Sequence, residues 1–191
     1  MTLIASFEIS WWNTWILMLG FLLHVPFMQL MGNLMKTGSI MAKMGGAPVS
    51  EKEKRVNLIA TVIYYLLIVL SVFLPLRFGT AWFYCGIAAW FVGMTVLILS
   101  IVSVAKTPTG RVFTTGPYRF SRHPLYLALS AVFIGAGLAS ASWLFLLLAG
   151  LYSVLLMIHV DSEEQECLAL FGDTYRNYAR RTPRWIGLPK A

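Results

Sequence analysis

Long apolar stretches separated by short polar segments dominate this chain. A helix needs about 20 mainly apolar residues to cross a bilayer, and residues 11–31, 56–76 and 81–104 each reach this length. Only residues 75–80 link the second stretch to the third, and Pro75 and Gly79 in this link are typical of a turn. We therefore expect three membrane helices, of which the second and third form an antiparallel hairpin.

Residues 125–160 form a longer apolar stretch without a charged side chain. As a single helix it would be about 54 Å long, whereas the hydrocarbon core is about 30 Å thick. The stretch must therefore fold back, and residues 135–137 (GAG) and 140–142 (SAS) are typical of a turn. These observations predict an all-α integral membrane protein with five transmembrane helices. The fourth helix is short, the last two form a hairpin, and a helical tail follows them.

Lys and Arg are distributed unevenly among the segments that link these helices. Residues 32–55, 106–123 and 161–191 contain five, four and five of them, and a five-helix topology places all three segments on one side. Arg77 is the one basic residue on the other side. Because basic loops stay in the cytoplasm, we expect a cytoplasmic C-terminus and an N-terminus on the opposite side of the membrane.

The composition agrees with a membrane protein. Apolar residues make up 58% of the chain and charged residues 12%, which excludes an ordinary soluble domain and a disordered chain. The net charge of +7 is typical of loops that face anionic lipids, so we expect no nucleic-acid partner. Cys85 and Cys167 have no His or Cys neighbour at metal-ligand spacing, which predicts neither a disulfide nor a metal site. Glu8 and the lack of an N-terminal basic segment argue against a cleavable signal peptide.

Polar residues concentrate in the second half of the chain. Pro108 and Pro117 prevent a long helix in residues 106–123, while the aromatic residues of this loop argue against disorder. Gly110 and Gly116 allow the backbone of the loop to approach a ligand closely.

The tail is predicted to be helical. Asp161 or Ser162 is expected to cap this helix, with Gln165 completing a capping box; Gly172 bends or breaks it, and Pro183 ends it. One face of the helix is aromatic, comprising Phe171, Tyr175 and Tyr178. Two interpretations explain this pattern equally well. The helix is amphipathic and lies on lipid head groups, or it forms part of a binding site.

Charges of opposite sign flank the predicted hairpin. Arg122 and His123 precede its first helix, and Glu163 and Glu164 follow its second, so we expect these four side chains to lie at the same depth and close together. Ionisable residues gathered at one membrane face are typical of a functional site. Snorkelling of Arg122 and solvation of glutamates at a helix start would explain the same pattern.

The motif sequence itself resembles a known family. Residues 116–126 (GPYRFSRHPLY), the later Glu163-Glu164 pair and residues 171–183 are similar to the isoprenylcysteine carboxyl methyltransferase family, to which phospholipid methyltransferases are related. The signature of that family is RHPxY, followed after a helical hairpin by two glutamates. The resemblance covers residues 106–183.

The resemblance implies a membrane enzyme without a Rossmann fold that binds S-adenosylmethionine and releases S-adenosylhomocysteine. It divides the chain into a three-helix transmembrane region, residues 1–105, and a catalytic region, residues 106–191. The residues that it places at the cofactor are Lys106, Arg111, Val112, Phe113, Gly116, Tyr118, His123, Pro124, Leu125, Tyr126 and Glu164. Arg122, Glu163 and Glu164 are the catalytic residues that we expect.

The expected acceptor is the C-terminal carboxylate of a prenylated cysteine, or a similar lipid-like molecule that enters from the bilayer. An amine acceptor such as phosphatidylethanolamine is the alternative on the same scaffold, and a sterol-type reductase is more distant because the short tail leaves little room for NADPH. A non-catalytic protein whose basic face binds anionic lipid is the alternative of a different class. Eukaryotic members of the family carry an Arg shortly before the paired glutamates, at the substrate, whereas residues 159–162 (HVDS) contain none.

Overall fold

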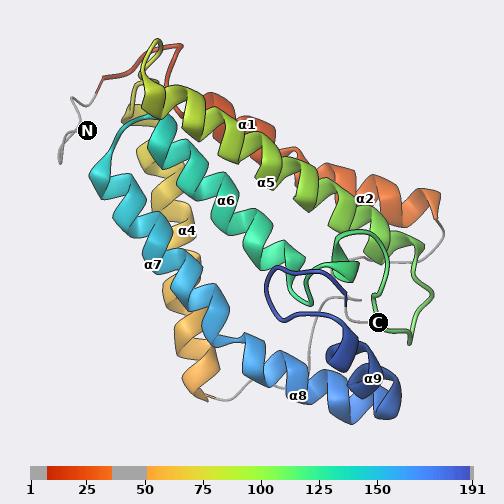
Figure 1. Cartoon of the computed structure of the whole chain (residues 1–191). Coiled ribbons are helices and arrows are strands. Elements are labelled where there is room, and N and C mark those ends of the chain that lie inside the picture. Colours follow the sequence, from red (N-terminus) through yellow and green to blue (C-terminus); the bar gives the residue numbers. More distant parts are fainter. Residues whose placement is uncertain (1–7, 36–50, 190–191) are drawn as a thin grey trace.

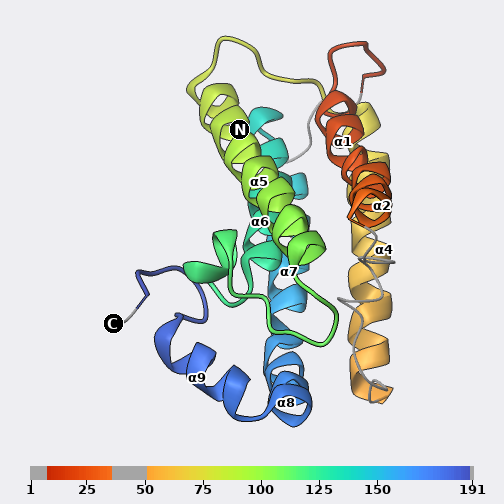
Figure 2. The same ribbon diagram turned by 90° about the vertical axis from the view of Figure 1, so that its right-hand side faces the viewer.

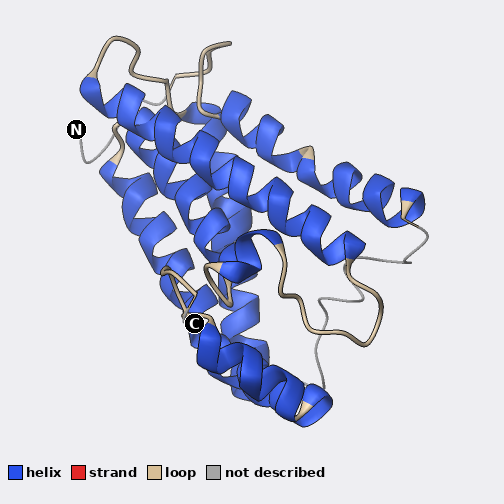
Figure 3. Cartoon of the chain, turned by 45° about the vertical axis from the view of Figure 1, so that its right-hand side comes forward, coloured by secondary structure: helices blue, strands red, loops and turns tan. Residues whose placement is uncertain are grey.

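The computed structural model describes residues 8–35 and 51–189, and within this part of the chain the regular structure is helical, without strands (Figure 3). The helices are α1 (Trp15–Leu22), α2 (His24–Leu34), α4 (Glu51–Phe73), α5 (Ala81–Lys106), the short 3₁₀ helix η1 (Gly116–Arg119), α6 (Pro124–Ala139), α7 (Trp143–Ile158), α8 (Val160–Phe171) and α9 (Asp173–Arg181). Four helical segments of the described residues are long and apolar enough to cross a bilayer, and α6 is a shorter apolar helix. The predicted all-α membrane architecture with a short fourth helix is confirmed.

The five predicted spans correspond to α1 with α2, and to α4, α5, α6 and α7, which run alternately in opposite directions (Figure 1). Large apolar side chains such as Val62, Phe91 and Leu147 remain exposed on α4, α5 and α7. Exposed apolar surface on long helices is stable in hydrocarbon and unfavourable in water, so these faces contact lipid.

The turn between α6 and α7 lies at Ser140–Ser142, as predicted, and the Ser142 hydroxyl accepts a hydrogen bond from the Phe145 amide. The prediction that residues 135–137 also belong to this turn is wrong, because they lie within α6. Gly135 faces α5 so closely that a Cβ there would lie 2.6 Å from the Trp90 amide nitrogen. Small residues permit such close helix contacts in membranes, and α5 and α6 form the most extensive helix pair of the fold.

The predicted hairpin of the second and third spans is also wrong. α4 packs against α7 and α1, whereas α5 packs against α6 and α2 (Figure 2). The link between α4 and α5 crosses the end of the bundle, where the Leu74 carbonyl accepts from the Thr14 amide at 2.8 Å and the Arg77 amide donates to the Ala139 carbonyl at 3.0 Å. These bonds hold the link open and separate the two helices.

The tail continues directly from α7. Together α7 and α8 form a helical segment of 29 residues, Trp143–Phe171, which is longer than a bilayer requires. Its first charged residue is Asp161, with His159 two positions before it, so we place the end of the span at Ile158 and α8 outside it. The predicted cap is wrong: α8 begins at Val160, and the Ser162 hydroxyl donates to the His159 carbonyl. A cap is unnecessary because the α7 end supplies carbonyls to the α8 amides, such as His159 to Glu163.

Gly172 breaks the tail helix, as predicted, with a backbone φ of +52° that favours glycine. α9 consequently turns back beside the loop that precedes α6 (Figure 1). This loop, α8 and α9 lie at one end of the bundle, which we call the basic end because ten described basic side chains are on it: Lys54, Arg55, Lys106, Arg111, Arg119, Arg122, Arg176, Arg180, Arg181 and Arg184. Arg77 lies at the opposite end, as predicted, while Lys36, Lys43, Lys190 and the side chain of Lys52 are outside the described part of the structure.

Candidate active site

Glu164, on α8, is the centre of a buried ionic cluster at the basic end. Its Oε1 lies 2.8 Å from Nη1 of Arg122 and 3.0 Å from Nε2 of His123, and its Oε2 lies 2.7 Å from Nη2 of Arg184. Both oxygens of the carboxylate are thus occupied by nitrogen donors. The predicted proximity of Arg122 and His123 to the paired glutamates is confirmed.

The local sequence fixes the donors of this cluster. Pro124 begins α6, so the preceding residues leave the helix, and the His123 amide donates to the Ser121 hydroxyl at 3.0 Å. The Arg122 amide donates to the Pro183 carbonyl at 3.0 Å, which attaches the segment after α9 to the loop before α6. This attachment brings Arg184 to Glu164.

Arg184 is a member of the cluster that was not predicted from the sequence. The contact spans 20 residues, and it exists because Gly172 turns α9 back on α8. The one sequence signal for this contact is that Arg184 is a basic residue directly after Pro183, which ends the helix. By itself this signal does not indicate which residue Arg184 contacts.

The cations of the cluster determine the charge state of Glu164. Burial by itself would raise the pKa of this carboxyl, but hydrogen bonds from Arg184 and His123 and the charge of Arg122 outweigh it, so the pKa lies below its usual range. The same pairing raises the pKa of Arg184. Glu164 is therefore an ionised structural anchor whose lone pairs are already engaged.

Glu163 is placed differently from its neighbour. Its Oε2 lies 3.4 Å from Nδ1 of His123, is buried, and has no hydrogen-bond partner among the described residues. The His123 ring stacks on Tyr126 with an interplanar angle of 3° and a centroid distance of 5.8 Å. His123 thus lies between the two carboxylates, and Glu163 retains an acceptor oxygen.

A cavity of about 800 Å³ opens beside this cluster. Ten of the residues predicted for the site line it: Arg111, Val112, Phe113, Tyr118, Arg122, His123, Pro124, Leu125, Tyr126 and Glu163. Glu164 lies behind them, and neither Lys106 nor Gly116 lines the cavity; Gly116 packs against Ser103 of α5. No metal-binding group of His, Cys, Asp and Glu side chains occurs in the described residues.

The cavity extends beyond the motif-bearing half of the chain. His24 and Met28 of α2 and Asn57 of α4 line it, and so do Leu97 and Ile101 of α5. These residues were not predicted, since no motif marks them. One end of the cavity is therefore polar, and the other continues between the apolar membrane helices.

Tyrosines of the loop and of α9 close the cavity at the basic end. The Tyr178 hydroxyl donates to the Tyr118 carbonyl at 2.8 Å, and the Tyr175 ring lies 5.9 Å from that of Tyr178. Burial and the nearby Glu163 charge raise the pKa of Tyr118, and burial likewise raises the pKa of Tyr175 and Tyr178. These phenols are neutral, and their rings form an aromatic wall next to charged groups.

The fold and the site define a helical integral membrane protein with a large cavity at the basic end, between an ionic cluster and apolar helices. Residues 76–174 match the phospholipid methyltransferase family, and the chain belongs to that family. The match includes the loop, the hairpin and α8, and it confirms the family resemblance of the motif sequence.

One curated relative carries a more specific name. The chain is 36% identical over 69 residues to methanethiol S-methyltransferase 1 of Bradyrhizobium diazoefficiens, a stretch that covers 36% of this chain and 24% of that protein. The similarity is thus limited to about a quarter of the relative's length.

Proposed function

We propose that this chain is an S-adenosylmethionine-dependent methyltransferase that methylates a lipophilic acceptor at the membrane surface, with the C-terminal carboxylate of a prenylated cysteine as the leading acceptor. The shape of the 800 Å³ cavity carries this proposal. Its polar end suits a charged cofactor, and its apolar end, between Leu97, Ile101 and Leu129, suits a hydrocarbon chain. Ligand cavities in proteins are usually about 300–1,000 Å³.

The residues at the polar end fit the cofactor. Two buried polar atoms there, Oε2 of Glu163 and Nε of Arg122, have no hydrogen-bond partner among the described residues. Glu163 would bind the ammonium group of the methionine part, and Arg111 would bind its carboxylate. When bound, S-adenosylmethionine supplies a methyl group on a positively charged sulfur.

The other predicted cofactor residues have separable tasks in this proposal. The aromatic faces of Tyr118 and Tyr126 would stabilise the cationic sulfur by about 0.5–2 kcal/mol each. Phe113, Pro124 and Leu125, together with Val112, would exclude water from it. For Lys106 and Gly116, only the family resemblance supports a role near the cofactor. Glu164 would act indirectly, by holding Arg122 and His123 in place.

The proposed orientation follows from the distribution of charge. The basic end would face the cytoplasm, which contains the soluble cofactor, and the N-terminus would lie on the opposite side. Residues 106–191 would form the catalytic region, and residues 1–105 would contribute the apolar part of the cavity. The acceptor would enter laterally from the bilayer.

The chemistry of the acceptor determines whether the site needs a base. A carboxylate is already ionised at neutral pH, so the enzyme would need only to orient and desolvate it. A phospholipid amine would have to lose a proton, and Oε2 of Glu163 could accept it only by giving up its bond to the cofactor ammonium group. A thiol is a further candidate because of the similarity to methanethiol S-methyltransferase 1, and it too would require deprotonation.

Binding of S-adenosylhomocysteine to the detergent-purified protein, measured by calorimetry, tests the enzymatic proposal. We expect one site per chain, and no binding would favour a non-catalytic lipid-binding protein. Transfer of a labelled methyl group to N-acetyl-S-farnesylcysteine, phosphatidylethanolamine or methanethiol then distinguishes the acceptors. Transfer to the first supports the leading acceptor, and transfer to either of the others alone overturns it.

A further inference from the structure

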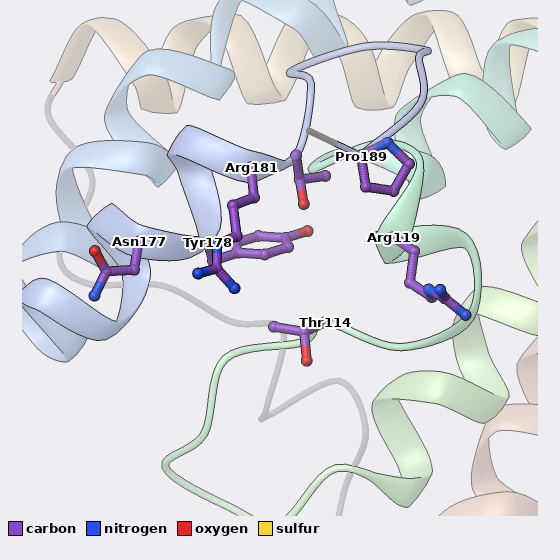
Figure 4. Close-up of a pocket in the computed structure, with 7 residues that line it drawn as sticks. Thr114, Arg119, Asn177, Tyr178, Arg181 and Pro189 are labelled. Atoms are coloured by element: carbon purple, nitrogen blue, oxygen red, sulfur yellow. The ribbon is translucent and has the colours of Figure 1, made fainter. Parts of the chain in front are cut away.

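A second cavity, of about 460 Å³, lies at the basic end beside the segment that follows α9 (Figure 4). Thr114 and Arg119 of the loop before α6 line it, and Asn177 and Arg181 of α9 line it from another wall. Tyr178 is the one residue that lines both this cavity and the candidate active site. The second cavity is therefore a separate compartment with its own polar groups.

The polar side chains that line this cavity can donate hydrogen bonds, and no carboxylate lies among the lining residues. Neither Arg119 nor Arg181 has an ion-pair partner among the described residues, and no Asp or Glu lines the cavity. Asn177 accepts a hydrogen bond from Arg180 through Oδ1, so its amide hydrogens remain to donate. Two guanidinium groups, an amide and the Thr114 hydroxyl suit an anion with several acceptor oxygens, such as a phosphate group.

The position of the cavity favours a lipid as the source of this phosphate. Arg119 lies five residues before Pro124, the first residue of membrane helix α6, and hence near the depth of the head groups. Two apolar side chains next to the lining residues are exposed, Phe120 at 48% and Leu188 at 80%. Basic groups beside exposed apolar side chains are typical of a surface that binds anionic lipid.

We propose that this cavity binds the phosphate group of an anionic membrane phospholipid between Arg119 and Arg181. The two arginines belong to different elements, η1 and α9, so a phosphate held by both would join them. The Tyr178–Tyr118 hydrogen bond already connects the same two elements next to the cavity. The bound lipid would thus hold the aromatic wall of the candidate active site in place from outside.

Calorimetric titration of the detergent-purified protein with dihexanoyl phosphatidylglycerol, below its micelle concentration, tests this proposal. We expect saturable binding that weakens at least 10-fold in the double variant Arg119→Gln/Arg181→Gln. The matched control Arg77→Gln/Arg176→Gln removes the same charge elsewhere and should change the affinity less than twofold. Inorganic phosphate, titrated in parallel, should bind much more weakly.

Three results would overturn the proposal: no saturable lipid binding, equal loss of affinity in both double variants, or equal affinity for inorganic phosphate. The unfolding temperature verifies that each variant is folded. If the double glutamine variant does not fold, Arg119→Ala and Arg181→Ala are titrated singly, and each should weaken lipid binding about threefold or more. Because the readout is lipid binding, the result is independent of methyl transfer.

Discussion

Arg184 binds Glu164 through two nitrogens, with Nη2 2.7 Å from Oε2 and Nε 3.2 Å from Oε1, although 20 residues separate them. The same guanidinium contacts Asp161 through Nη1 at 2.9 Å. Arg184 therefore attaches the C-terminal segment to α8, on which Glu163 also lies. The loop, the hairpin and the tail are connected at this one carboxylate.

Replacing Arg184 with alanine should weaken S-adenosylhomocysteine binding without unfolding the protein. Glu164 would keep Arg122 and His123, but the C-terminal segment would lose its attachment to α8. Since 40% of the Arg184 side chain is exposed, solvent screens the ion pair, and we expect a loss of affinity of roughly 3- to 10-fold. Calorimetry measures it. Arg176→Ala serves as the control, because it removes an exposed ion pair with Asp173 on the protein surface. Equal losses of affinity in both variants would contradict the prediction.

The two neighbouring glutamates should respond differently to the same substitution. Glu164→Gln leaves two arginines without their shared carboxylate, and unpaired charges in a buried cluster are costly. We expect this variant to lose methyl transfer and to unfold roughly 5 °C or more below the wild type. Glu163→Gln replaces an oxygen that has no hydrogen-bond partner among the described residues and whose contact with His123 is as long as 3.4 Å, so it should lose methyl transfer at a nearly unchanged unfolding temperature.

Turnover of the purified variants and their unfolding temperatures, followed by tryptophan fluorescence, measure the two effects separately. Arg122→Ala should behave like Glu164→Gln, because it removes another member of the cluster. Full turnover in Glu163→Gln would refute the role proposed for that oxygen.

The sequence predicted the ionic cluster only in part, for a physical reason. Arg122 and Glu164 could be placed together because a folded-back apolar stretch must bring its two ends to the same depth. Arg184 could not, since its contact depends on the direction in which α9 leaves Gly172. The backbone angles at that glycine, φ +52° and ψ −126°, set the direction, and the residue type reveals only that a break is permitted.

Helix lengths were predictable, but helix partners were not. Apolar length identifies a span whatever its neighbour is, and a short link suggests that consecutive spans are neighbours. α5 instead packs against α6, where Gly86 meets Gly135. Two helix backbones can approach closely only where small residues of both helices face each other. The sequence of one helix does not show which residues of another helix it will face.

Gly86→Ala should consequently destabilise the fold. A Cβ at this position would lie 2.5 Å from the Gly135 carbonyl oxygen and 2.8 Å from Cα of Ala139, both backbone atoms that cannot move aside cheaply. We expect an unfolding temperature at least roughly 5 °C lower. Gly150→Ala is the matched control, because no heavy atom beyond the adjacent backbone of α7 lies within 4 Å of its Cβ position and alanine favours a helix by about 0.5–1 kcal/mol over glycine. An equal decrease for both variants would show that the close α5–α6 contact is not the cause.

His159 provides the last prediction, which concerns the acceptor. It lines the candidate cavity near the α7–α8 junction, and its Nε2 is buried without a hydrogen-bond partner among the described residues. A buried polar atom of this kind is stabilised when a ligand supplies the missing hydrogen bond. Because Glu163 and Arg111 are the groups proposed to bind the cofactor, we assign Nε2 of His159 to the polar group of the acceptor.

His159→Leu should lower kcat/KM for the acceptor by roughly 10-fold, which corresponds to the loss of one hydrogen bond of about 1.4 kcal/mol. The affinity for S-adenosylhomocysteine should stay within twofold of the wild type, because the cofactor does not need this side chain. His159→Gln restores a hydrogen-bonding group and should recover part of the lost kcat/KM. A parallel decrease in cofactor affinity, or an unchanged kcat/KM in His159→Leu, would place the polar group of the acceptor elsewhere in the cavity, away from His159.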